Sequence, residues 1–239
     1  MLRKALQSFA RAAGYEVRRS TPTSNTTDWL LNFATMAGVT TILDVGANTG
    51  QFGSTVIAAG WTGRLISFEP LSTAHAKLVE TSARHPQWQA ASRMAIGAQL
   101  GMAEINIAGN SQSSSLLPML ERHLGAAPNS GYIGTETVPL ASLDEALAVA
   151  APDECYMLKM DVQGFESEVL QGAQQTLGRI AVIYTEMSLQ PLYHGEALFT
   201  DLSRDIMALG YRCVGLQPGY ADATNREMLQ VDGVFVRNV

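Results

Sequence analysis

The sequence has few cysteines and few charged side chains, and it lacks a long apolar run. Its 239 residues include two cysteines, and charged residues make up 16% of the chain. Two cysteines are too few for a disulfide scaffold or a cysteine-rich zinc site, so we expect free thiols in a reducing compartment. The apolar runs are too short to cross a bilayer. Hydrophobic residues make up 46%, which is enough for a sizeable core in one or two domains.

Positive charge is scarce outside the N-terminal segment. The net charge of −6 and the pI of about 5.2 disfavour a nucleic-acid partner. Residues 1–19 hold five arginine and lysine side chains against one acid, Glu16. Their apolar residues recur at helical spacing, which predicts an amphipathic helix packed on the domain. The alternatives are docking on an anionic membrane or a partner enzyme, and a transit peptide. No secretory signal pattern follows, so we expect a cytoplasmic protein whose membrane contact, if it has one, is peripheral and at the inner face.

Strands and helices alternate along most of the chain. Apolar and β-branched runs predict strands at 41–45, 64–68, 88–96, 102–107, 156–160, 181–185, 212–216 and 231–237. Repeated strand–helix units predict a doubly wound, mostly parallel α/β sheet, and the last two strands predict an antiparallel pair at its edge. We expect residues 1–38 to form a helical segment and linker, and residues 39–239 to form one domain. Ligands of such sheets bind at the carboxyl ends of the strands.

A glycine-rich turn follows the first strand and begins with an acid. The residues that define this turn are Asp44, Gly46, Ala47, Asn48 and Gly50. The glycines let the backbone turn tightly and approach a ligand closely. A dinucleotide site has the spacing G-x-G-x-x-G and keeps carboxylates away from the pyrophosphate. The spacing here is G-x-N-x-G, and the carboxylate of Asp44 suits an ammonium or sulfonium group. The turn therefore favours S-adenosylmethionine as the ligand over NAD.

Further acids and one histidine follow later strands. Glu69, just before Pro70, ends the second strand, where an acid accepts hydrogen bonds from ribose hydroxyls. Asp161 and Glu186 end two adjacent strands, where they can share a divalent cation such as Mg²⁺ or form an acid–base pair. His194 is another candidate general base because imidazole titrates near neutral pH. Helix capping for Asp161 and simple surface exposure for Glu186 and His194 are the alternatives.

Several short motifs follow one another in a specific order. They occupy residues 44–50, 68–70, 95–97, 142–144, 158–166, 169–173, 186, 191–193 and 230–236. Together they resemble the FkbM family of S-adenosylmethionine-dependent methyltransferases over about residues 40–239. The resemblance implies a Rossmann-like class I methyltransferase fold with a seven-stranded sheet. It also implies O-methyl transfer to a hydroxyl group, commonly on a sugar, a glycolipid or a secondary metabolite.

The resemblance also implies roles for individual residues. By position, the cofactor-binding residues are Asp44, Gly46, Ala47, Asn48, Gly50, Glu69, Pro70, Ala95 and Asp161. The resemblance implies that Asp161 faces the sulfonium end of the cofactor and that Glu69 holds the ribose. One departure concerns Gln163, because the family usually has Glu at this position. If that Glu helps to bind a metal, this chain has lost a charge there.

Three other functions compete with methyl transfer to a small-molecule or glycan acceptor. An NAD-dependent oxidoreductase shares the fold, but its turn has a different spacing. A non-catalytic cofactor-binding module is supported by Gln163 alone. An RNA methyltransferase is disfavoured by the acidic composition. We expect the acceptor to contact loops at 110–129 and 189–196.

Overall fold

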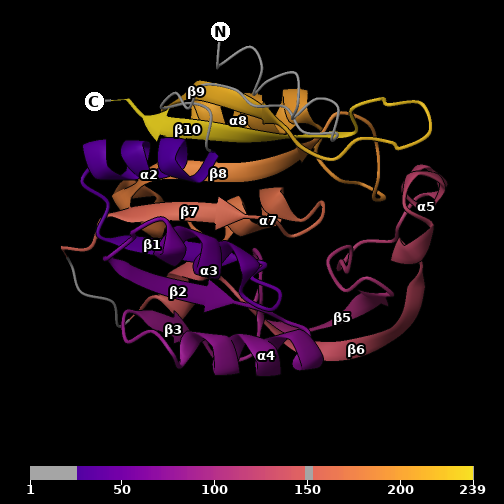
Figure 1. Ribbon diagram of the computed structural model, residues 1–239, viewed down its shortest axis with the longest axis horizontal. Helices are drawn as coiled ribbons and strands as arrows, with labels where there is room; N and C mark the ends of the chain where they lie inside the picture. The colour runs from indigo at the N-terminus through magenta and orange to yellow at the C-terminus, as the bar shows by residue number, and fades with distance from the viewer. Residues whose placement is uncertain (1–25, 149–152, 239) are drawn as a thin grey trace, which may run out of the picture.

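A seven-stranded sheet with helices on both faces forms the frame of the molecule (Figure 1). The computed structural model describes residues 26–148 and 153–238. The strand order is β3-β2-β1-β7-β8-β10-β9, and β10 runs antiparallel to both of its neighbours. These strands are β1 Thr41–Val45, β2 Arg64–Phe68, β3 Trp88–Ala90, β7 Tyr156–Met160, β8 Ile180–Ser188, β9 Tyr211–Pro218 and β10 Gln230–Arg237. The expected doubly wound, mostly parallel sheet with an antiparallel edge is confirmed.

Each face of the sheet is covered by its own set of helices. One face packs against α2 (Thr26–Met36), α3 (Gln51–Ala58) and α4 (Ser72–Ser82). The other packs against α6 (Leu143–Ala146), α7 (Glu166–Gln171) and α8 (Phe199–Ala208). Successive strand residues point to opposite faces, so Ile42 joins the first layer and Leu43 the second. Within the described residues, no helix has both the length and the apolar character that crossing a bilayer requires. The basic segment 1–19 lies outside the described residues.

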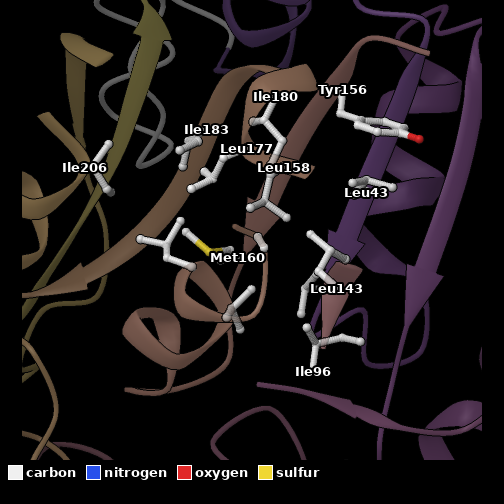
Figure 2. Close-up of a cluster of buried hydrophobic side chains, with 14 of the residues drawn as sticks. Leu43, Ile96, Leu143, Tyr156, Leu158, Met160, Leu177, Ile180, Ile183 and Ile206 are labelled. Carbon is white, nitrogen blue, oxygen red and sulfur yellow. The ribbon is translucent and has the colours of Figure 1, made fainter. Parts of the chain in front are cut away.

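Figure 2 shows the apolar cluster on the second face. Leu158 and Met160 on β7 are fully buried beside Leu43 of β1 and Ile183 of β8. Burying such a side chain stabilises the fold by roughly 1.5–3 kcal/mol relative to exposing it. The central strands are therefore held firmly, and the positions where they end are fixed by this packing.

A smaller sheet lies beside the carboxyl ends of β1, β2 and β7 (Figure 1). It has the order β4-β6-β5, with β4 at Ala95–Ile96, β6 at Tyr132–Ala141 and β5 at Gly101–Ala108. The expected single strand at 88–96 is therefore wrong: its first part joins the large sheet and its last part the small one. Arg93 lies in the intervening bend and donates a hydrogen bond to the carbonyl of Pro70 (3.0 Å). The short helix α5 (Glu121–Ala126) lies in the segment between β5 and β6.

The helix that follows β7 is short. α7 ends at Gln171, and a 3₁₀ turn occupies Thr176–Arg179. A Cβ at Gly172 would lie 2.0 Å from the carbonyl oxygen of Gly97, so this glycine lets two backbones touch. The carboxylate of Asp144 then accepts the backbone N–H groups of residues 175 and 176. Tertiary contacts therefore end the helix early.

Candidate active site

A cavity of about 500 Å³ opens at the carboxyl ends of the central strands. Its lining comes from the turns after β1, β2 and β7, from the ends of β8 and β10, and from the serine-rich segment 110–115. A ligand at this edge of a doubly wound sheet is the general rule for the architecture. The cavity is large enough for a nucleoside-sized ligand.

The turn after β1 is built by close backbone contacts. Gly46 has φ 78°, and a Cβ there would lie 1.9 Å from the carbonyl oxygen of Asp161. The N–H groups of Gly46 and Ala47 both donate to the carbonyl of Phe68, at 3.1 and 3.0 Å. The N–H of Asn48 donates to the carboxylate of Glu69 at 2.7 Å. These N–H groups are engaged within the chain, so the turn does not offer them to a diphosphate as a dinucleotide site does.

Asp44 lies beneath this turn and does not line the cavity. Its side chain is 0% exposed, and it accepts a hydrogen bond from the hydroxyl of Ser67 at 3.0 Å. The ammonium of Lys159 lies 3.0 Å from the other carboxylate oxygen and donates to the carbonyl of Gly46 at 2.9 Å. The expectation that the Asp44 carboxylate faces a positively charged ligand is therefore corrected. Its charge is taken up by a buried cation from the neighbouring strand.

Strand register produces this ion pair. Asp44 of β1 and Lys159 of β7 are direct partners in a parallel ladder, so their side chains leave the sheet on the same face. Burial alone would lower the pKa of Lys159, but the carboxylates of Asp44 and Asp161 outweigh it and raise that pKa. The lysine is therefore charged at neutral pH. Phe52 of α3 covers it, with the ring centroid 5.6 Å from the ammonium.

Glu69 occupies the expected place at the end of β2 and lines the cavity. One of its oxygens accepts the N–H of Asn48, and the other accepts the N–H of Leu71 at 2.8 Å. Burial raises the pKa of Glu69 to about 7, although these two hydrogen bonds act in the opposite direction. The adjoining part of the lining is apolar and includes Leu71, Ala95 and Ile105. A carboxylate beside an apolar wall suits a ribose joined to a flat base.

A cluster of carboxylates surrounds the other part of the cavity. Asp161 follows β7, Glu186 lies on β8, and Asp232 on β10 is the register partner of Glu186. The Asp161 side chain is 42% exposed. Burial raises the pKa of Glu186 well above its usual range, and Asp161 and Asp232 raise it further. Burial and Asp161 likewise raise the pKa of Asp232 to about 6. Acidic groups are thus concentrated at the ends of three neighbouring strands, and their proximity opposes the ionisation of Glu186 and Asp232.

Most of the site residues expected from the sequence line the cavity. They are Gly46, Ala47, Asn48, Glu69, Pro70, Ala95, Asp161 and Glu186. Asp44, Gly50 and His194 do not. Gly50 has φ 92° and packs under Trp88, where a Cβ would lie 2.8 Å from the indole, so its role is structural. His194 is exposed on a loop, where its backbone N–H donates to the carbonyl of Pro118 (2.8 Å), and it does not line the cavity, so the structure does not place it as a general base.

Sequence reasoning missed several residues that line the cavity. Lys159 is the single charge of an otherwise apolar strand, and Asp232 interrupts the apolar run 231–236, and these signals could have marked them. Tyr184 stacks on Phe52 with ring centroids 6.1 Å apart, and His123 reaches the cavity from α5. Their positions depend on pairings between distant segments, which the spacing of residues does not reveal.

The segment 110–115 folds over the cavity through its own hydrogen bonds. The amide of Asn48 donates to the hydroxyl of Ser111 at 3.2 Å, and the hydroxyl of Ser115 donates to the carbonyl of Gln163 at 2.7 Å. These contacts join the serine-rich segment to the turns after β1 and β7. The segment is therefore part of the wall of the site.

The strand order, the antiparallel β10 and the cavity at the strand ends define a Rossmann-like methyltransferase fold. The solved METTL16 methyltransferase domain has the same fold, with a TM-score of 0.50 at 8% identity over 93% of this chain and 71% of that one. Magnesium protoporphyrin IX methyltransferase from Synechocystis PCC 6803, solved with bound S-adenosylmethionine, aligns at a TM-score of 0.47 and 11% identity, covering 89% and 78% of the two chains.

The sequence comparison is more specific than the fold. Residues 44–213, more than half of the chain, match the methyltransferase FkbM domain, so the chain belongs to this family of S-adenosylmethionine-dependent methyltransferases. A curated relative, the 2-O-methyltransferase NoeI of Sinorhizobium fredii, is 29% identical over 161 residues. That match covers 65% of this chain and 66% of the relative, just under two thirds of its length. Family membership confirms the resemblance drawn from the motifs and removes the NAD-dependent oxidoreductase as an alternative.

Proposed function

We propose that this methyltransferase transfers the methyl group of S-adenosylmethionine to a hydroxyl oxygen of a sugar-containing acceptor. The proposal is supported by family membership and by the relative NoeI, whose name describes a 2-O-methyltransferase. The observation that carries it is the position of Asp161, a partly exposed carboxylate at the end of β7 that lines the cavity together with Glu69. A base at this place can receive the proton that an alcohol loses when it is methylated.

The chemistry of the lining fits the cofactor. Glu69 would accept hydrogen bonds from the ribose hydroxyls, and the apolar wall at Leu71 and Ala95 would pack against the adenine. Asp161 and Glu186 would provide negative potential for the sulfonium and ammonium groups. When bound, S-adenosylmethionine supplies an activated methyl group on a positively charged sulfur. The chain must hold the acceptor in line with that group and exclude water.

The proton of the acceptor hydroxyl needs a defined destination, because an aliphatic alcohol is almost never ionised at pH 7. We assign that role to the Asp161 carboxylate, which takes the proton as the new oxygen–carbon bond forms. General-base catalysis of this kind contributes about 10²–10⁴ in rate.

The lining also narrows the class of acceptor. Among the described residues that line the cavity are the carboxylates of Glu69, Asp161, Glu186 and Asp232, against the single ammonium of Lys159. That ammonium is already paired with Asp44. A polyanionic acceptor such as RNA would be repelled by this lining. Hydroxyl-rich, uncharged acceptors instead match the carboxylates and the serine side chains that the site presents.

Two measurements test the proposal. Calorimetric titration with S-adenosylmethionine should give saturable binding at one site per chain. Transfer of a labelled methyl group should then be followed on a panel of oligosaccharides, each paired with its 2-deoxy analogue, and the product located by mass spectrometry and NMR. We expect methylation of the sugars that carry a free hydroxyl and none of the matched deoxy compounds. Cofactor binding without any methylated product, across glycans and lipid-linked sugars, would instead favour a non-catalytic module.

A further inference from the structure

Gln163 lies at the centre of the carboxylate cluster in a constrained backbone conformation. Its φ is 55°, a left-handed value that residues other than glycine seldom adopt, and Gly164 follows with φ 95°. The carbonyl of Gln163 accepts the hydroxyl of Ser115 at 2.7 Å, which ties this loop to the serine-rich segment. An unfavourable conformation that is held by specific contacts directs the side chain to a defined place.

The side-chain amide of Gln163 joins the two acids that end neighbouring strands. Its Nε2 donates one hydrogen bond to Oδ1 of Asp161 at 2.8 Å and a second to Oε2 of Glu186 at 2.9 Å. The amide nitrogen has two hydrogens, and each carboxylate takes one of them. The same oxygen of Glu186 also accepts the side-chain amide of Gln230 at 2.7 Å. The facing oxygens of both acids are therefore engaged by N–H donors.

The orientation of the Gln163 amide is set by its other end. Oε1 accepts the phenol hydroxyl of Tyr193 at 2.7 Å. Turning the amide over would place its N–H₂ group against that hydroxyl and its oxygen against two carboxylates, which repel it. Tyr193 is almost fully buried. The donor hydrogens of Gln163 therefore point at Asp161 and Glu186 and cannot easily be turned away.

This donor set does not fit a divalent cation. Mg²⁺ or Ca²⁺ requires several oxygen ligands, whereas the space between Asp161 and Glu186 is filled by an amide nitrogen with its hydrogens. The oxygen of the same amide is turned toward Tyr193. Over the described part of the chain, no group of three or more histidine, cysteine, aspartate or glutamate side chains is arranged to hold a metal ion. The expectation that Asp161 and Glu186 share a cation is corrected by these contacts.

We infer that the Gln163 side-chain amide takes the place of a divalent cation between Asp161 and Glu186, so that methyl transfer by this chain uses no metal ion. The inference rests on the proposed function for its catalytic part, while its metal-binding part stands alone. The amide holds the two acids together as a cation would, but it does not neutralise them. The Asp161 carboxylate therefore stays available to a positively charged cofactor and to the proton of the acceptor. Gln163 is thus a positioning residue, acting through Asp161.

The decisive experiment is a titration of the purified full chain with Mn²⁺, followed by calorimetry and by the loss of the free Mn²⁺ electron paramagnetic resonance signal. We expect no saturable site in the wild-type chain. The variant Gln163→Glu converts the donor into a third carboxylate beside Asp161 and Glu186. It should bind one Mn²⁺ per chain saturably, at least about tenfold more tightly than any residual binding by the wild type, since affinity rises with the number of charged oxygen ligands.

Matched variants separate the new ligand from the lost amide. Gln163→Leu removes the amide without adding an oxygen, and it should bind Mn²⁺ no better than the wild type. Adding Asp161→Asn to Gln163→Glu should abolish the new site. Thermal unfolding and S-adenosylmethionine binding of each variant show whether it is folded. If Gln163→Glu does not fold, the titration of the wild-type chain still decides the question.

Saturable Mn²⁺ binding to the wild-type chain at one site, lost on Asp161→Asn, would overturn the inference. Methyl transfer that stops in chelator and returns with Mn²⁺ would overturn it as well. Equal rates with chelator and with added Mn²⁺ are the expected result. Failure of the proposed function has a different signature, because it gives no methylated acceptor under any condition while the metal titration is unaffected.

Discussion

Two groups of charged side chains lie at the ends of β1, β7, β8 and β10, and they differ in the balance of positive and negative charge. Asp44 and Lys159 form a buried pair of opposite charges, covered by α3 and Ser67. Asp161, Glu186 and Asp232 are like charges gathered around the cavity. The pair is electrically balanced, and only its lysine reaches the cavity, whereas the cluster consists of acids alone and has a partly exposed member.

The difference shows that the most conspicuous acid of the sequence is not the one that faces a ligand. Asp44 stands at a strand end beside a glycine turn, yet its neighbour in register supplies a cation and leaves nothing for a ligand to neutralise. The acids that line the cavity are less well matched by positive charge. Among the described residues, the ion pair found for them is the one between Lys159 and Asp161, whose charged atoms lie 3.8 Å apart. Four variants sharpen this contrast between a structural pair and a reactive cluster.

The largest effect is expected from Asp161→Asn. The amide has nearly the same shape but cannot take up a proton, so kcat should fall by about 10²–10⁴ while binding of S-adenosylmethionine is largely retained. Steady-state kinetics and calorimetry measure the two quantities separately. Glu104→Gln, an exposed acid outside the cavity, is the matched control and should leave kcat unchanged. Normal turnover by Asp161→Asn would show that another group is the base.

Lys159→Met tests the structural pair. Removing the cation leaves the Asp44 carboxylate buried without a counter-charge, which should lower the free energy of unfolding by about 3–5 kcal/mol. Urea denaturation at pH 7 gives this quantity. The double variant Asp44→Asn with Lys159→Met removes both charges and should regain much of the loss. A single variant as stable as the wild type would mean that the pair contributes little to the fold.

Glu69→Gln should weaken binding of S-adenosylmethionine by about tenfold to a hundredfold. This loss corresponds to one hydrogen bond to a charged group, which contributes about 1.5–3 kcal/mol. The wild-type chain should also lose affinity on acidification. Burial raises the pKa of Glu69 to about 7, so the carboxylate that we propose for the ribose hydroxyls is protonated below that pH. Affinity is therefore full above about pH 7 and falls by up to about tenfold per unit below it.

The variant itself provides the control for this pH dependence. With glutamine at position 69, calorimetric titrations between pH 5.5 and 8 should show a much flatter affinity profile. Lys159 and Asp44, the two charged groups that act on the residue at position 69, remain in place in this variant. A profile as steep in Glu69→Gln as in the wild type would assign the titration to a different residue.

The smallest effect is expected from His194→Ala. The imidazole is exposed and outside the cavity, so kcat should change by less than about twofold, far from the roughly 10²–10⁴ that loss of a general base causes. Steady-state assays with the best acceptor from the panel measure it. A drop of a hundredfold would show that the loop at 191–195 closes over the acceptor during turnover.

The sequence predicts the central strands well because their signal is local. The runs at 41–45, 64–68 and 156–160 coincide with β1, β2 and β7, since each is a short apolar stretch between turn residues. The run at 88–96 predicts one strand, although the structure divides it between two sheets. A bend held by Arg93 and the pairing of β4 with β6 cause this division, and neither is visible in the local pattern.

Residue order alone determined the alternating architecture, the glycine turn after β1 and the set of acids that follow the strands, because these depend on local spacing and conformational preference. Only the tertiary structure decided which acids meet the cavity. Parallel register turned Asp44 toward Lys159, and a left-handed Gln163 placed an amide between Asp161 and Glu186. The physical reason is that a side chain's electrostatic role depends on the charges beside it, and those come from strands far apart in the sequence.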